Sequence, residues 1–216
     1  MVSRITLVGR LPLAKARLIV GLTGTFGSGK STVGRVFKRL GARKVIDADR
    51  LVDEVFRSEQ AIRKQIQQLF GIRGRINRKF IAKIVFKDSR RRRRLEAMIH
   101  PYVFKRIRSE LEKVRSGVIV LEIPLLFETG ANRFCDVTVA VVSGAHHIIK
   151  RLSRKGFSSK EVCARLRAQL SQKEKERRAD FFIRNSGSKA ALIKHASLVW
   201  QKLISWSIKA KKERRG

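Results

Sequence analysis

Two kinds of hydrophobic pattern alternate along the chain: short runs that are apolar almost throughout, and longer stretches with apolar residues at helical spacing. Runs of the first kind occupy residues 18–23 (LIVGLT), 118–123 (VIVLEI) and 136–142 (DVTVAVV). Such runs are typical of strands buried in a parallel sheet. Two shorter strands are predicted at Lys44–Ile46 and Asp180–Ile183.

Helical patterns occupy the intervals between these strands. Residues 30–40 carry Val33, Val36 and Phe37 at helical spacing, and Gly41 follows where a helix stop is expected. A block without strands comes after the second strand, and further helices are expected from residue 146 and after residue 187. This alternation predicts an α/β fold, a parallel sheet with helices on both faces and a helical insertion between its second and third strands.

Capping residues mark where several of these helices begin. Asn77 is expected to cap one helix of the insertion, and Asp88 or Ser89 a longer one that runs towards residue 114. Ser158 and Glu161 have the spacing of a capping box, which predicts another helix start.

Composition narrows the class of protein. A chain of 216 residues with 43% hydrophobic content suits one globular domain with a packed core. Its apolar runs are all far shorter than the roughly 20 residues that cross a membrane, so we expect no membrane association. The only cysteines are Cys135 and Cys163, which excludes a disulfide scaffold and fits a reducing, cytoplasmic location.

The charge is strongly positive, with 51 Lys and Arg against 17 Asp and Glu and a formal net charge of +34. Its densest places are residues 90–94, 173–178 and 209–215, but basic residues occur along the whole chain. One interpretation is a solvated basic surface, and the other is affinity for polyanions. Because stacking aromatics and zinc-finger or RNP-type signatures are absent, we expect no specific nucleic-acid partner, only weak and salt-sensitive binding.

One motif carries the chemistry. Residues 24–31 (GTFGSGKS) match the phosphate-loop pattern G-x-x-x-x-G-K-[ST] and lie between a predicted strand and a predicted helix. Glycines let successive N–H groups face a polyphosphate, and the helix N-terminus adds positive potential. Lys30 can reach the β- and γ-phosphates of ATP, and the Ser31 hydroxyl can ligate Mg²⁺. The alternative is a chance glycine-rich turn. The expected ATP-binding residues are Gly24, Thr25, Phe26, Gly27, Ser28, Gly29, Lys30, Ser31 and Thr32.

Two carboxylates stand at the end of the second strand. Asp47 and Asp49 are two residues apart, so on an extended chain both side chains leave the same face. Ligands of open parallel sheets bind at the carboxyl ends of strands. A carboxylate there can orient a hydroxyl beside the γ-phosphate and accept its proton. The alternative for either aspartate is a helix cap.

Six segments together resemble the dephospho-coenzyme A kinase family: GLTGTFGSGKST, VIDADRLV, RLEAMIHPYV, VLEIPLLFETG, RLSRKGFS and RADFFIRNSGS. They occur in the family's order between about residues 18 and 206. The resemblance implies a P-loop NTPase-type fold and phosphorylation of the ribose 3′-hydroxyl of dephospho-coenzyme A by ATP. It assigns the catalytic carboxylate to Asp49 and leaves Asp47 as an acceptor-binding residue.

The resemblance also implies a division of the chain. Residues 17–207 would form a single kinase domain in which residues 50–115 bind the acceptor and residues 145–178 form a helical lid. Residues 1–16 would be a basic N-terminal extension, either an appended segment or an overlong start, and residues 208–216 a basic tail.

Further roles follow from the resemblance, each beside a structural alternative. His100 would bind the acceptor, or be a half-buried helix residue. Arg151 and Arg154 of the lid would neutralise the transferring phosphate, Arg151 as a catalytic residue, or lie on a solvated helix face. Asn185 and Gly187 would approach the adenine of ATP. Glu122 would bind Mg²⁺, or be a strand-end acid satisfied by its neighbours.

Two departures from the family pattern and two rival functions remain. The unbroken run at residues 90–94 replaces a helix of mixed charge, and Arg184 stands where an acid is usual. The rivals are a P-loop kinase for another small alcohol, such as a nucleoside or shikimate, and a basic nucleic-acid-binding P-loop protein.

Overall fold

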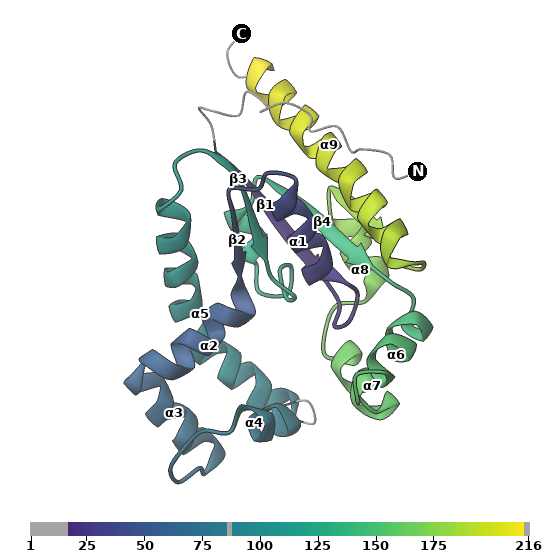
Figure 1. Ribbon diagram of the computed structural model, residues 1–216. Coiled ribbons are helices and arrows are strands. Elements are labelled where there is room, and N and C mark those ends of the chain that lie inside the picture. Colours follow the sequence, from purple (N-terminus) through teal and green to yellow (C-terminus); the bar gives the residue numbers. More distant parts are fainter. Residues whose placement is uncertain (1–16, 86–87, 214–216) are drawn as a thin grey trace.

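Five parallel strands form the sheet of the computed structural model, which describes residues 17–85 and 88–213. Their order across the sheet is β2-β3-β1-β4-β5, with β1 in the centre (Figure 1). All five predicted strands are confirmed. They are β1 (Arg17–Gly24), β2 (Lys44–Asp47), β3 (Gly117–Glu122), β4 (Val137–Val142) and β5 (Phe181–Arg184).

The two faces of the sheet bury alternate residues of the same strands, as the pleat requires. On one face, Val20 and Val120 pack with α1 (Lys30–Arg39) and α9 (Lys189–Glu213). Phe37 of α1 lies against Trp200 of α9, with ring centroids 5.3 Å apart. On the other face, Ile119 packs with the helices inserted after β2.

The insertion forms a four-helix lobe, here called the α2–α5 lobe, at the carboxyl end of β2 (Figure 1). Asn77 accepts a hydrogen bond from Phe80 N at 3.2 Å, and Asp88 accepts bonds from the N–H groups of Arg90 and Arg91, both at 2.9 Å. Both predicted caps are therefore confirmed. The helices are α2 (Ala48–Ser58), α3 (Gln60–Phe70), α4 (Arg78–Val85) and α5 (Ser89–Glu112).

A second helical group follows β4. Helices α6 (Ala145–Ser153) and α7 (Ser159–Arg167) extend beyond the sheet, whereas α8 (Gln172–Arg178) packs against β4 and β1 (Figure 1). Ser158 caps α7 through Glu161 N at 3.2 Å, as predicted. Helix α8 and the short 3₁₀ helix η1 (Ala131–Phe134) were not predicted, because a short basic run and a single turn carry no apolar periodicity.

The two ends of the chain are where the sequence predicts segments outside the kinase domain. The predicted extension at residues 1–16 lies outside the described residues. Helix α9 continues to Glu213, past the predicted start of the tail at residue 208. Within the described ranges, no helix is long and apolar enough to cross a membrane.

Candidate active site

The phosphate loop, residues 24–31, connects the carboxyl end of β1 to the N-terminus of α1. Gly27 and Gly29 have φ angles of 76° and 102°, in the left-handed region that favours glycine. A Cβ on Gly29 would also collide with the Asn185 amide, and one on Gly27 with Leu152 of α6. The glycines of the motif therefore serve both the turn and the close packing of distant segments against it.

Two hydroxyl groups are buried within this loop. Thr25 and Ser28 are 3% and 1% exposed, and neither hydroxyl oxygen has a hydrogen-bond partner in the described part of the chain. Buried polar groups almost always have partners in a complete site. These two hydroxyls mark the loop as a place for a polar ligand.

Lys30, Ser31 and Glu122 form one hydrogen-bonded cluster at the base of the loop. Glu122 Oε1 accepts bonds from Lys30 Nζ and Ser31 Oγ, both at 2.6 Å. The register explains the contact, because Glu122 ends β3 directly beside Leu22 of β1. The close approach also needs glycine at position 34, where a Cβ would lie 2.8 Å from Glu122 Oε2.

The expectation that Asp47 and Asp49 leave an extended chain on one face is wrong. The strand ends at Asp47 and α2 begins at Ala48, so Asp49 lies in the first helical turn. Asp47 caps this helix, since its Oδ1 accepts a bond from Asp49 N at 2.9 Å. A capping side chain stabilises the first turn of a helix, because the first N–H groups of the helix lack partners within it. Asp49 is exposed at the helix start.

Arg151 of α6 reaches the phosphate loop, as its predicted role requires. Its Nη1 donates to Gly27 O at 2.5 Å, and its Nη2 to Asn185 O at 3.4 Å. Partial burial lowers the pKa of the Arg151 guanidinium, yet arginine stays charged. Arg154, three residues on, is exposed at the end of α6 and is not brought into this contact.

Asn185 closes the other side of the loop. It is 5% exposed, and its Nδ2 donates to Ser28 O at 2.7 Å. Its backbone continues the β5–β4 ladder, because Asn185 N donates to Val142 O at 2.7 Å. Gly187 is exposed two residues later, away from these bonds.

A further group of contacts to the loop escaped the sequence analysis. The N–H of Phe26 donates to Gln169 Oε1 at 3.1 Å, and the rings of Phe26 and Phe157 meet edge to face at 5.3 Å. The Arg165 guanidinium lies 4.5 Å from the centre of the Phe26 ring. Helix α7 and the segment after it are thereby tied to the tip of the phosphate loop.

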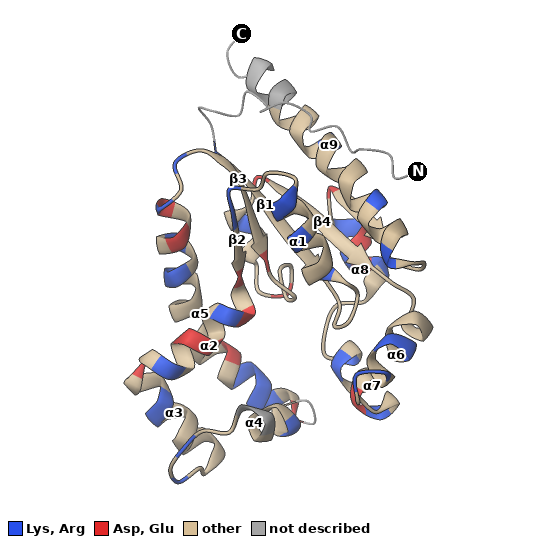
Figure 2. Ribbon diagram, viewed as in Figure 1, with Lys and Arg blue, Asp and Glu red and all other residues tan. Residues whose placement is uncertain are grey.

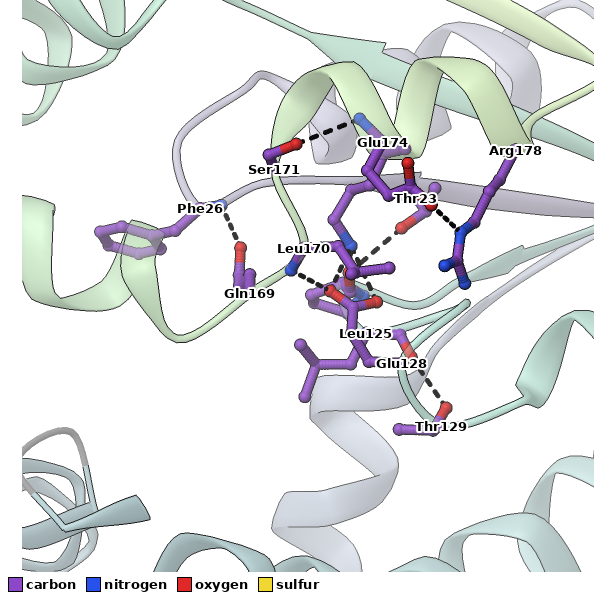
Figure 3. Close-up of polar contacts among 12 residues, drawn as sticks. Thr23, Phe26, Leu125, Glu128, Thr129, Gln169, Leu170, Ser171, Glu174 and Arg178 are labelled. Carbon is purple, nitrogen blue, oxygen red and sulfur yellow. Dashed lines mark hydrogen bonds and ion pairs between the residues drawn. The ribbon is translucent and has the colours of Figure 1, made fainter.

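The ion pair of the buried Lys175 with Glu128 also escaped the sequence analysis, since residues 173–178 read as a surface charge run. Figure 3 shows the Glu128 carboxylate at the centre of this network. Lys175 is 0% exposed, and its Nζ donates to both Glu128 oxygens at 2.7 and 2.9 Å and to Pro124 O at 2.7 Å. Leu170 N donates to the same carboxylate at 2.9 Å. Burial lowers the pKa of Lys175, an effect that Glu128 opposes and nearby Lys30 reinforces.

His100 lies apart from the phosphate loop contacts. Its ring stacks on Phe104, with centroids 5.7 Å apart, and lines a cavity of about 700 Å³ beside α5 that Arg133 of η1 also lines. Burial lowers the pKa of the His100 ring. His100 is half-buried on α5, which fits the structural alternative given for it.

A parallel sheet with a phosphate loop at the end of its central strand, and helices docked on that loop, defines a P-loop kinase. The family model for dephospho-CoA kinase matches residues 18–191. The chain belongs to the dephospho-CoA kinase family.

Individual relatives agree with this family. The dephospho-CoA kinase of Thermus thermophilus is 36% identical over 81% of this chain and 86% of its own, and that of Leptospira interrogans is 34% identical over 88% and 95%. The solved structure of TT1252 from Thermus thermophilus covers 88% of this chain and 99% of its own, with 35% identity and a TM-score of 0.74. A shikimate kinase from Bacteroides thetaiotaomicron, at 17% identity and a TM-score of 0.51, shares the fold.

Proposed function

We propose that this chain transfers the γ-phosphate of ATP to the ribose 3′-hydroxyl of dephospho-coenzyme A, giving coenzyme A and ADP. The observation that carries the proposal is the Lys30–Glu122–Ser31 cluster at the base of a phosphate loop, in a chain that belongs to this kinase family. Phosphoryl transfer asks a protein mainly for positioning and charge neutralisation. The groups around this loop are suited to both.

Three residues would act on the reacting atoms. Lys30 would bind the β- and γ-phosphates, and Arg151, whose guanidinium already lies at Gly27, would neutralise charge on the transferring group. Asp49, at the exposed start of α2, would orient the acceptor hydroxyl and take its proton. Asp47 supports this placement by fixing the helix start.

Ser31 and Glu122 suit a magnesium ion. Mg²⁺ prefers oxygen ligands and is usually held by one or two carboxylates together with substrate phosphates. Glu122 Oε1 and Ser31 Oγ already lie 2.6 Å apart, so one ion could touch both. No group of three or more acids, histidines or cysteines suited to a metal occurs within residues 17–85 and 88–213. The bound ion would supply positive charge beside the phosphates.

The two helical groups would have separate roles, one as the lid and the other in binding the acceptor. Residues 145–178 would form the lid, since Arg151, Gln169 and Arg165 all contact the phosphate loop or its aromatic tip. Asn185, which donates to Ser28 O, would hold the phosphate loop next to the adenine of ATP. Gly187 and Arg154 would lie nearer to solvent. The α2–α5 lobe would bind the acceptor. Closure of the lid would exclude water, which limits wasteful hydrolysis of ATP.

A coupled assay of ADP release tests the proposal, with dephospho-coenzyme A, adenosine and shikimate as alternative acceptors. Much faster ADP release with dephospho-coenzyme A than with adenosine or shikimate is the expected result. A preference for adenosine or shikimate would instead support a kinase for another small alcohol.

We place the reaction in the cytoplasm, because Cys135 and Cys163 are free thiols.

A further inference from the structure

Three arginines converge on a cavity of about 350 Å³ in the α2–α5 lobe. They come from three different segments: Arg57 from α2, Arg63 from α3 and Arg75 from the loop that precedes α4. Phe56 and Ile76 give the cavity an apolar part, and Asp53 is the only acidic residue that lines it in the described part of the chain. A hollow with this lining carries a net positive charge.

The three guanidinium groups are exposed, and none forms an ion pair with another residue of the described ranges. Their neighbour Arg106 behaves differently, since it bonds to Glu59 at 3.0 Å and approaches Glu54 at 4.0 Å. Like charges brought together repel one another, and a bound anion removes that repulsion. Guanidinium groups bind phosphate oxygens through paired, charge-assisted hydrogen bonds.

The cavity lies on the same face of α2 as Asp49. Asp53, Phe56 and Arg57 follow Asp49 by four, seven and eight residues, which is the spacing of one helical stripe. At about 1.5 Å of rise per residue, the α2 residues that line the cavity lie roughly 6 to 12 Å along the helix from Asp49. Helix α2 leads away from the phosphate loop (Figure 1), so a molecule anchored at Asp49 can extend along this stripe.

We propose that Arg57, Arg63 and Arg75 form a subsite for the 5′-diphosphate of the acceptor. This proposal rests on the proposed function. In dephospho-coenzyme A the diphosphate is attached to the same ribose as the 3′-hydroxyl, separated from it only by C3′, C4′, C5′ and O5′. A ribose whose 3′-hydroxyl lies at Asp49 can therefore place its diphosphate along α2, within reach of the three arginines.

Steady-state kinetics of Arg57→Met, Arg63→Met and Arg75→Met test the subsite, with dephospho-coenzyme A and ATP varied in turn. Each variant should raise KM for dephospho-coenzyme A by about 10- to 100-fold, the range for losing a hydrogen bond to a charged group. The turnover number and KM for ATP should stay near the wild-type values. The corresponding lysine variants should recover part of the affinity, because lysine keeps the charge but not the paired geometry.

Arg73→Met is the matched control, because Arg73 is exposed on the same loop as Arg75 but does not line the cavity. It should leave KM for dephospho-coenzyme A unchanged. Adenosine, which lacks the diphosphate, provides a second control: its kcat/KM should be the same in the wild type and in all three variants.

The outcomes separate this subsite from the proposed function. If the wild-type protein does not phosphorylate dephospho-coenzyme A, the proposed function fails. If the wild type is active but the cavity variants match Arg73→Met, the subsite is wrong. An equal loss with adenosine would also overturn it, because the arginines would then act without recognising the diphosphate. Thermal melts establish that each variant is folded.

Discussion

A single carboxylate oxygen connects the parts of the candidate nucleotide site. Glu122 Oε1 holds both the Lys30 ammonium and the Ser31 hydroxyl, and Lys30 and Glu122 are 9% and 4% exposed. Removing two charged groups from water is costly unless each is paired and hydrogen-bonded. The pairing compensates for the burial of both groups and holds the Lys30 side chain at the base of the loop.

Lys30→Ala tests this residue. The ammonium should stabilise the transition state more than the bound nucleotide, so we expect turnover to fall by at least about a hundredfold. The measurement is the rate of ADP release by purified protein whose melting curve shows it to be folded. Turnover near the wild-type value would remove the assignment of the phosphate loop.

Asp47 and Asp49 offer a second comparison at this scale. Asp49→Asn keeps the shape of the side chain but loses the proton acceptor, so turnover should fall by about 10²- to 10⁴-fold. The affinity for ATP should barely change. Asp47→Asn should have a milder effect, because asparagine caps helices about as well as aspartate and Asp47 acts as the cap of α2.

Turnover and ATP affinity, measured for both variants, decide between the two aspartates. An active Asp49→Asn protein beside an inactive Asp47→Asn protein would transfer the catalytic role to Asp47. If both variants keep full turnover, the pair is structural.

At the scale of elements, the question is what attaches the proposed lid to the sheet. Helix α8 lies against β4 and β1, and its buried Lys175 is bonded to the segment that follows β3 through Pro124 O and the Glu128 carboxylate. The same carboxylate receives Leu170 N at the start of this connection. The pair therefore anchors the end of the lid while α6 and α7 remain further out.

Glu128→Gln should destabilise the fold strongly, because it leaves the buried Lys175 ammonium without its charged partner. Breaking a buried ion pair costs about 3–5 kcal/mol. The double variant Lys175→Met/Glu128→Gln should recover part of this loss, since no unpaired charge remains. Urea unfolding of the single and double variants measures both values.

Glu174→Gln is the control for this prediction. Glu174 is on the same helix, and its pairs with Arg177 and Arg178 are largely exposed. Exposed pairs contribute little, about 0–1 kcal/mol, so the control should unfold near the wild-type urea concentration. A loss in Glu128→Gln no larger than in this control would show that the Lys175–Glu128 pair does not anchor α8.

At the scale of the whole molecule, the net charge of +34 is the property that the proposed reaction does not require. Figure 2 shows Lys and Arg on the α2–α5 lobe, on helices α6 to α8 and on α1 and α9 rather than in one element. A diffuse distribution of this kind favours non-specific attraction to anions.

RNA binding should therefore be weak, independent of sequence and lost steeply as salt rises, because such binding depends on the release of counterions. Titration of several RNAs of unrelated sequence at two or three salt concentrations measures this. Selective binding that persists at high salt would contradict the diffuse-charge interpretation and favour a nucleic-acid function.

The sequence by itself determined the features that depend on near neighbours. Apolar runs predicted three strands and shorter segments the other two. The side chains of Asn77, Asp88 and Ser158 predicted helix starts, and the phosphate loop followed from its glycines and its place between a strand and a helix. Each of these features is decided within about one turn or one strand, so local pattern suffices.

Only the tertiary structure decided which distant residues complete the site. Glu122 meets Lys30 across 92 positions of the chain, Arg151 meets Gly27 across 124, and Asn185 meets Ser28 across 157. These contacts depend on the strand order, which places β3 and β4 on either side of β1. The orientation of Asp49 also differs from what the sequence pattern predicted. A helix begins at Ala48, so the chain does not stay extended at this aspartate. Local pattern records none of this, because the partners come together only when the sheet assembles and buries them.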